Sequence, residues 1–175
     1  MRHERSGITG KIVERELFGK SRYQEVTGEQ FEDFKFREPE QAFEFLKTLQ
    51  PFPDPTKPGR EFAYMVHRYV FKMMGLDASQ LCFYTAIDSS LDRYQGIDGW
   101  FEANLSGGGT RVSIDLTTNP EKERGKADIV FLVPHDGLAL KVDKEQFMSY
   151  SRELAIEIVE FFKQQGVSPE RGDYE

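Results

Sequence analysis

Two strand-like patterns joined by a glycine-rich turn decide the fold of this chain, and they occupy residues 96–117: GIDGWFEANLSGGGTRVSIDLT. Successive side chains of a strand point to opposite faces. The aliphatic residues of the second pattern share one face: Val112, Ile114 and Leu116. Asp98 and Asp115 lie on the other face of their strands. The short glycine-rich connection predicts an antiparallel hairpin, so we expect one aliphatic face and one acidic face.

Further elements are predicted on both sides of this hairpin. Alternating or continuous apolar patterns predict four strands, at residues 81–87, 96–103, 110–117 and 128–133. Apolar residues at helical spacing predict three helices, at residues 39–50, 59–75 and 144–165. From residue 59 onward the order is helix, four strands, helix. This order predicts an α/β or α+β fold, with a central mixed sheet of about four strands flanked by helices.

A proline-rich stretch divides the chain. Residues 51–59 hold four of the eight prolines, and proline removes a backbone donor, so we predict an extended linker there. Residues 1–50 are then expected to form an N-terminal extension that carries the short helix. Residues 60–166 form a single core domain, and residues 167–175 form a polar tail.

The charge of the chain is acidic and unevenly distributed. The 175 residues hold 23 Lys and Arg against 30 Asp and Glu, a net charge of −7. Residues 76–175 hold 10 basic and 18 acidic residues, a net charge of 10 − 18 = −8. Electrostatic binding of nucleic acid over a broad surface needs many basic side chains, so the sequence excludes this mode of binding.

Two other classes of protein are also excluded. No apolar run approaches the ~18 residues of a membrane span, and the N-terminus shows no apolar signal segment, so we expect a cytoplasmic location and no membrane partner. The single cysteine, Cys82, excludes an internal disulfide framework and a cysteine-based zinc cluster. The three histidines show no metal-ligand spacing, and the expected role of His67 is structural.

The acidic face of the hairpin is the candidate site. Asp is disfavoured within strands, so Asp98 and Asp115 on neighbouring strands carry a cost unless a cation or hydrogen bonds compensate it. Two carboxylates at one site repel each other, and a divalent cation removes that repulsion. Oxygen-only ligands suit Mg²⁺. The alternative to a metal site is that the two acids lie on the solvated face of an antiparallel hairpin and bind no ligand.

These residues carry a family resemblance. The segment Gly96–Glu102, the hairpin and the segment Val112–Thr117, after the helix at 59–75, resemble the PD-(D/E)XK nuclease superfamily, whose core is restriction-endonuclease-like. The resemblance implies that Asp98 matches the first acid of the motif and Asp115 the second. The motif lysine is replaced by Thr117 in this sequence.

The resemblance implies an activity and a set of site residues. The protein would be a Mg²⁺-dependent nuclease-like hydrolase of phosphodiester bonds, with Asp98 and Asp115 as metal ligands. Lys122 or Lys126, in the following loop, would replace the missing lysine, and Glu61 on the helix at 59–75 would add a ligand. Thr117 supports an alternative, a non-catalytic member of the same fold that serves as an interaction or assembly module. Nucleic acid, a protein partner and a homodimer all stay open.

Overall fold

A four-stranded mixed β-sheet forms the centre of the computed structural model, which describes residues 3–27, 38–105, 108–123 and 125–168. The strands are β1 (Leu81–Thr85), β2 (Gly99–Leu105), β3 (Gly108–Thr117) and β4 (Ile129–Leu132), in that spatial order. Strands β1, β2 and β3 are antiparallel neighbours, and β4 runs parallel to β3. The predicted central mixed sheet is confirmed, and so is the β2–β3 hairpin.

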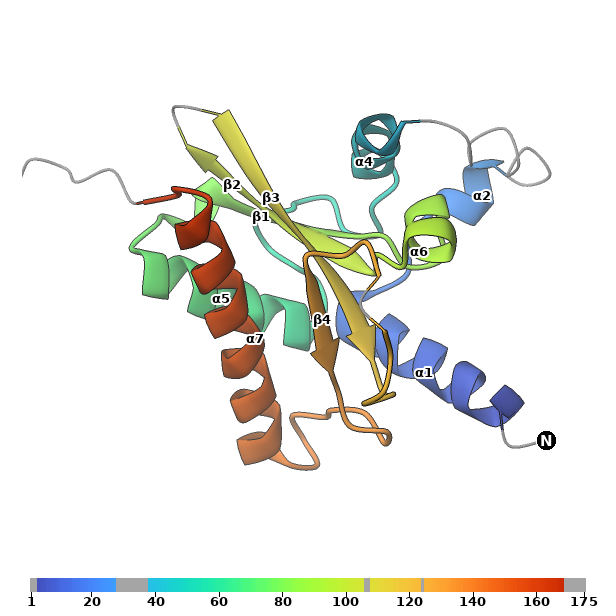
Figure 1. Ribbon diagram of the computed structural model, residues 1–175. Helices are drawn as coiled ribbons and strands as arrows, with labels where there is room; N and C mark the ends of the chain where they lie inside the picture. The colour runs from blue at the N-terminus through green and yellow to red at the C-terminus, as the bar shows by residue number, and fades with distance from the viewer. Residues whose placement is uncertain (1–2, 28–37, 106–107, 124, 169–175) are drawn as a thin grey trace, which may run out of the picture.

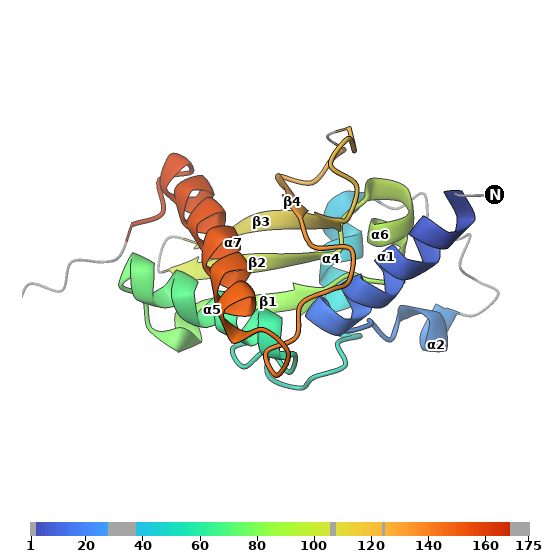
Figure 2. The ribbon, with the colours of Figure 1, turned by 90° about the horizontal axis from the view of Figure 1, so that it is seen from below.

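Helices cover both faces of this sheet, which gives an α+β fold (Figure 1). Helices α5 (Glu61–Met74) and α7 (Lys144–Gln164) lie together on one face. Helix α4 (Pro39–Lys47) and helix α6 (Ser90–Gln95) lie on the other side (Figure 2). Helix α1 (His3–Phe18) packs into the same apolar cluster as α5 and α7. Two shorter elements are also found among the described residues, helix α2 (Tyr23–Thr27) and the 3-10 turn at Ala78–Gln80.

The main core lies between the sheet and helices α5 and α7. It contains the aliphatic face of β3 that the sequence predicts, with Val112, Ile114 and Leu116 fully buried. The rings of Phe62 on α5 and Phe147 on α7 meet edge to face, 5.8 Å apart. The predicted helix ends are confirmed where Gly75 closes α5 in the left-handed conformation and where the Asp143 side chain caps α7.

The first helix belongs to the same core and is not an appended segment. Val13, Leu17 and Phe18 of α1 are buried in the main cluster, and the Phe18 ring lies 5.0 Å from that of Phe83. A Cβ at Gly99 would lie 2.9 Å from the Phe18 ring, so α1 approaches β2 closely because residue 99 has no side chain. The predicted boundary at residue 50 therefore does not coincide with a boundary in the packing.

The predicted linker at 51–59 forms no helix or strand, but it packs against the sheet. The Phe83 amide of β1 donates to the Pro55 carbonyl at 2.9 Å, and the Gln50 side chain bonds both backbone groups of Thr85. The open edge of β1 is thereby partly satisfied. Two predicted features fall partly outside the described residues: the turn at Ser106–Gly107 and the tail beyond residue 168.

The second face of the sheet is covered, which contradicts the solvated face that the sequence allowed. A second apolar cluster includes Trp100, which is fully buried, and Phe43 of α4, whose ring lies 4.9 Å from that of Trp100. Ile97 also packs in this cluster; it lies between the end of α6 and the start of β2 at Gly99. The acidic side chains on this face are consequently buried.

Candidate metal centre

Asp98 lies immediately before β2, and Asp115 lies on β3 next to Ile114. The register of the two strands ends at Gly99↔Ile114, and the Asp98 amide donates to the Ile114 carbonyl at 2.8 Å. Both aspartates are only 2% exposed. One oxygen of Asp98 accepts a hydrogen bond from the Leu116 amide at 2.7 Å. The structure thus brings together the two acids that the sequence selects, in a nearly dry environment.

Lys122 reaches back to Asp115 from the loop after β3. Its ammonium lies 2.7 and 2.9 Å from the two carboxylate oxygens. The Thr117 hydroxyl accepts from the Asn119 amide at 3.0 Å and so starts the tight turn that returns Lys122 to the strand. Burial alone would lower the pKa of Lys122, but the hydrogen bond and charge of Asp115 outweigh it and raise that pKa.

Two other predicted site residues are not brought to this place. Glu61 is exposed in the first turn of α5 and lines a separate hollow with Glu16 and Leu138. Lys126 is exposed, and within the described ranges no ion pair is found for it. Their expected roles therefore have no support in the geometry.

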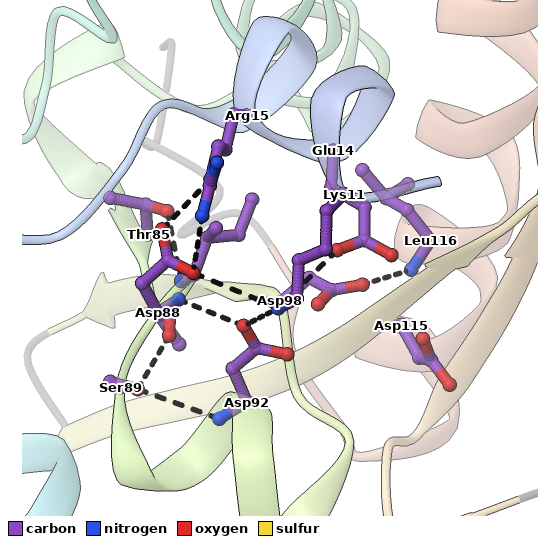
Figure 3. Close-up of polar contacts among 12 residues, drawn as sticks. Lys11, Glu14, Arg15, Thr85, Asp88, Ser89, Asp92, Asp98, Asp115 and Leu116 are labelled. Atoms are coloured by element: carbon purple, nitrogen blue, oxygen red, sulfur yellow. Dashed lines mark hydrogen bonds and ion pairs between the residues drawn. The ribbon is translucent and has the colours of Figure 1, made fainter. Parts of the chain in front are cut away.

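Two further acids join Asp98 instead. Glu14 of α1, Asp92 of α6 and Asp98 each offer one carboxylate oxygen, and these three atoms lie within 4.8 Å of one another (Figure 3). We call these residues the acid triad. It draws on three separate elements, so it exists only because α1 packs across the start of β2 and α6 precedes it. Asp115 lies beside the acid triad but is not one of its members.

Cations border the acid triad on one side. The Lys11 ammonium forms a hydrogen bond to Asp92 and lies 3.9 Å from Asp88. Arg15 binds Asp88 with two nitrogens, at 2.9 and 3.1 Å. Asp88 has a positive φ of 63°, which is uncommon for a residue with a side chain, and its amide donates to Asp92 at 2.8 Å. These contacts hold the β1–α6 connection against the strain of that conformation.

The electrostatics of the acid triad oppose full ionisation. Burial, followed by the charges of Glu14, Asp92 and Asp115, raises the pKa of Asp98 well above its usual range. Burial also raises the pKa of Glu14, to about 7, and the charges of Asp92 and Asp115 add to the effect. The buried Oε2 of Glu14 has no hydrogen-bond partner in the described part of the chain; the Lys11 ammonium lies 3.8 Å away. A proton or a metal cation is needed to neutralise this group of acids.

The donor set suits a hard divalent cation. Three carboxylates and the absence of sulfur or imidazole among them favour Mg²⁺, Mn²⁺ or Ca²⁺ over zinc. His67 is buried elsewhere, where its Nε2 lies 2.6 Å from the Leu81 carbonyl, and burial lowers its pKa. Cys82 is also buried away from the site, as a free thiol.

Four residues of the site were missed at the sequence level: Lys11, Glu14, Arg15 and Asp92. A signal for Asp92 is present, because Ser89-Ser90-Leu91-Asp92 matches a capping box and Gly96 ends the helix. For α1, the apolar pair Val13 and Leu17 at a spacing of four indicates a helix. Nothing local shows that this helix packs against β2, so its polar side chains could not be assigned to the site.

Comparison of the chain with protein families, with curated proteins and with solved structures finds no match in any of the three.

Proposed function

We propose that this protein is a Mg²⁺-dependent, nuclease-like hydrolase of phosphodiester bonds, with the acid triad as its metal centre. The observation that carries the proposal is the convergence of Glu14, Asp92 and Asp98 within 4.8 Å at a site where Asp98 is 2% exposed. A folded chain does not place three acids so close in a dry site without a compensating charge. The described cations of the site are paired with Asp88, Asp92 and Asp115, so they only partly supply it.

The side chains around the acid triad have separate roles in this proposal. A bound divalent cation would polarise a phosphoryl oxygen and lower the pKa of a water molecule. The Leu116 amide fixes the orientation of the Asp98 carboxylate. Lys122, with 39% of its side chain exposed, holds Asp115 and presents its remaining donors to a water molecule or a phosphate oxygen. The resemblance to PD-(D/E)XK nucleases implies Asp98 and Asp115 as metal ligands; the proposal keeps Asp98 as a ligand and gives Asp115 the role of holding Lys122.

Metal binding is the first test. Protein treated with a chelator should gain several degrees in melting temperature when Mn²⁺ or Mg²⁺ is added, because a ligand that binds only the folded state stabilises it. Asp98→Asn and Glu14→Gln should remove this gain. Glu102→Gln is the matched control, since Glu102 is a buried acid four residues after Asp98 but lies outside the acid triad. No stabilisation of the wild-type protein by either ion would refute the proposal.

Hydrolysis is the second test. Bis(4-nitrophenyl) phosphate should be cleaved with Mn²⁺ and not with a chelator, and Asp98→Asn should abolish the activity. The alternative function, a non-catalytic interaction module, is favoured by Thr117 at the position of the motif lysine. Metal binding without cleavage of this ester or of any nucleic acid would select that alternative.

No described helix combines the length and the apolar character that a membrane span requires.

A further inference from the structure

A surface hollow adjoins the acid triad. It measures about 420 Å³ and is lined by six residues: Lys11, Gln24, Asp88, Ser89, Asp92 and Arg93. Asp92 is both a wall of this hollow and a member of the acid triad. In Figure 3 the Asp92 carboxylate lies between the Asp88–Ser89 turn and Asp98. A reactant bound in the hollow would therefore contact the acid triad at Asp92.

The size of the hollow limits what can enter. Sites for small organic ligands span about 300–1,000 Å³, so 420 Å³ holds a ligand of about nucleotide size. Asp98 and Asp115 are each 2% exposed, so a phosphate must move into the protein to approach them. The backbone of a duplex is stiff and bordered by neighbouring phosphates, whereas a single nucleotide unit can extend into such a hollow.

The charges around the hollow also favour a small anion. Lys11, Arg15 and Arg93 supply +3, while Glu14, Asp88, Asp92 and Asp98 supply −4 when all are ionised. One divalent cation changes the sum to 3 − 4 + 2 = +1, which matches the single negative charge of a phosphodiester. A duplex is normally held by many Lys and Arg residues along its backbone, and residues 76–175 carry a net charge of 10 − 18 = −8.

An exposed aromatic ring follows the lining residue Arg93 on helix α6. Tyr94 is 41% exposed, and the guanidinium of Arg93 lies 5.6 Å from the centre of its ring. Exposed aromatic rings and arginine planes are the surfaces on which unpaired bases stack. A base can use them only when it is not already stacked within a duplex.

We propose that the substrate of this site is a phosphodiester of nucleotide size, with its phosphate in the Lys11–Arg93 hollow and its base against Tyr94, in preference to a duplex. This inference rests on the proposed function. The reaction is a hydrolysis: a water oxygen bonds to phosphorus, one ester P–O bond breaks, and the leaving alkoxide takes the proton that the water loses. The products are a phosphomonoester and an alcohol.

The test compares four substrates on the full-length protein with Mn²⁺. They are the 4-nitrophenyl ester of thymidine 5′-monophosphate, 2′,3′-cyclic AMP, a 20-nucleotide single strand and the corresponding duplex. We expect kcat/KM for at least one of the first three to exceed that for the duplex by at least tenfold. Comparison among the first three shows whether the phosphodiester comes from a free nucleotide, as in the first two substrates, or from the end of a strand, as in the third. Equal or faster cleavage of the duplex would overturn the inference.

Variants of the tyrosine identify the stacking surface. Tyr94→Ala should raise KM for the preferred substrate about tenfold with little change in kcat, since loss of one stacked base costs about that factor. Tyr94→Phe keeps the ring and should behave as the wild type. Tyr64→Ala is the control, because Tyr64 is an equally exposed tyrosine on α5. An unchanged KM in Tyr94→Ala would contradict the stacking role.

Failure of this inference can be told apart from failure of the proposed function. The Mn²⁺-induced gain in melting temperature should persist in all Tyr94 variants, because Tyr94 is not a metal ligand. If Mn²⁺ binds but no substrate is cleaved, we would measure the binding of thymidine 5′-monophosphate to the Mn²⁺-loaded protein, which tests whether the hollow holds a nucleotide. Binding that Tyr94→Ala weakens about tenfold supports the site, and no binding to the wild type overturns it.

Discussion

Two buried acids lie four residues apart, Asp98 immediately before strand β2 and Glu102 within it, and they have different partners. Glu102 accepts hydrogen bonds from the Trp100 indole at 3.1 Å and from Arg111 at 3.3 Å, and it pairs with Lys47 at 2.9 Å. We call these four residues the Glu102 network. The side chains of this network that donate to Glu102 satisfy its carboxylate, so no ligand is needed to neutralise it.

Asp98 differs from Glu102 in having few hydrogen-bond donors and an excess of negative charge around it. One backbone amide donates to it, and the charges of the three carboxylates of Glu14, Asp92 and Asp115 add to burial in raising its pKa. Two buried acids only four residues apart thus differ: the protein itself supplies the partners of Glu102, whereas Asp98 is left among excess negative charge. The comparison shows that burial of an acid indicates a ligand site only when donors and cations are too few.

The largest expected effect is on the Glu102 network. Glu102→Ala leaves Lys47, Arg111 and the buried Trp100 indole without their shared acceptor, and we expect a loss of about 3 kcal/mol in the free energy of unfolding. Urea denaturation measures it. Glu44→Ala is the control, because Glu44 also pairs with Lys47 at 2.9 Å but is 66% exposed. A loss no larger than that of the control would show that the Glu102 network is not a structural unit.

The acid triad should instead make stability depend on pH. The pKa of Glu14 is about 7 in the folded protein against 4.5 in the unfolded chain, so the folded state binds more protons between these values. Stability must then fall as pH rises from 4.5 to 7, by about 2 kcal/mol in metal-free protein. The raised pKa of Asp98 acts in the same direction.

Urea denaturation at pH 5, 6 and 7 checks this dependence. Glu14→Gln should flatten the fall, and Glu102→Gln should leave its slope unchanged. If the wild type and Glu14→Gln lose the same stability over this range, Glu14 is not protonated in the folded protein and the contrast between the two acids fails.

A smaller effect is expected at the border of the acid triad. Arg15→Ala removes the two-nitrogen contact to Asp88, whose side chain is 6% exposed, and should cost about 1.5 kcal/mol. Arg22→Ala is the comparison, since Arg22 and Glu25 are both more than half exposed, and it should cost less than ~0.5 kcal/mol. Thermal melting measures the loss of stability in each variant. Equal losses in Arg15→Ala and Arg22→Ala would mean that burial of the Asp88 carboxylate does not require the contact with Arg15.

The smallest effect on stability separates the two candidate lysines. Lys122→Ala should cost about 1 kcal/mol because Asp115, whose side chain is 3% exposed, loses its partner. Lys126→Ala should leave the melting temperature within error of the wild type. If the proposed function holds, only the first variant should also reduce Mn²⁺-dependent cleavage. Similar results for both would remove Lys122 from the site.

Much of the fold follows from local patterns. Alternation places Val112, Ile114 and Leu116 on one face of β3, and the glycine-rich turn pairs it with β2, because these rules need only neighbouring residues. Helices α5 and α7 follow from their apolar periodicity and their end signals. Helix α6 was missed although its capping residues are visible, because six residues are too few for periodicity to show.

The candidate site was predictable only in part, for a related reason. Asp98 and Asp115 are found from sequence because strand pairing fixes which side chains face each other. Lys122 is found because a short turn limits its reach to Asp115. Glu14 lies 84 residues before Asp98, and only the packing of α1 against Gly99 brings the two together.

The amino-acid sequence by itself therefore determined the sheet, its two faces and the pair of acids Asp98 and Asp115, since these depend on spacing along the chain. Tertiary structure decided that the acidic face is buried, that Glu102 is neutralised and that Asp98 meets Glu14 and Asp92. These outcomes depend on which helices cover the sheet, and the free energy of that packing is shared among many contacts distant in the sequence. No local pattern carries it.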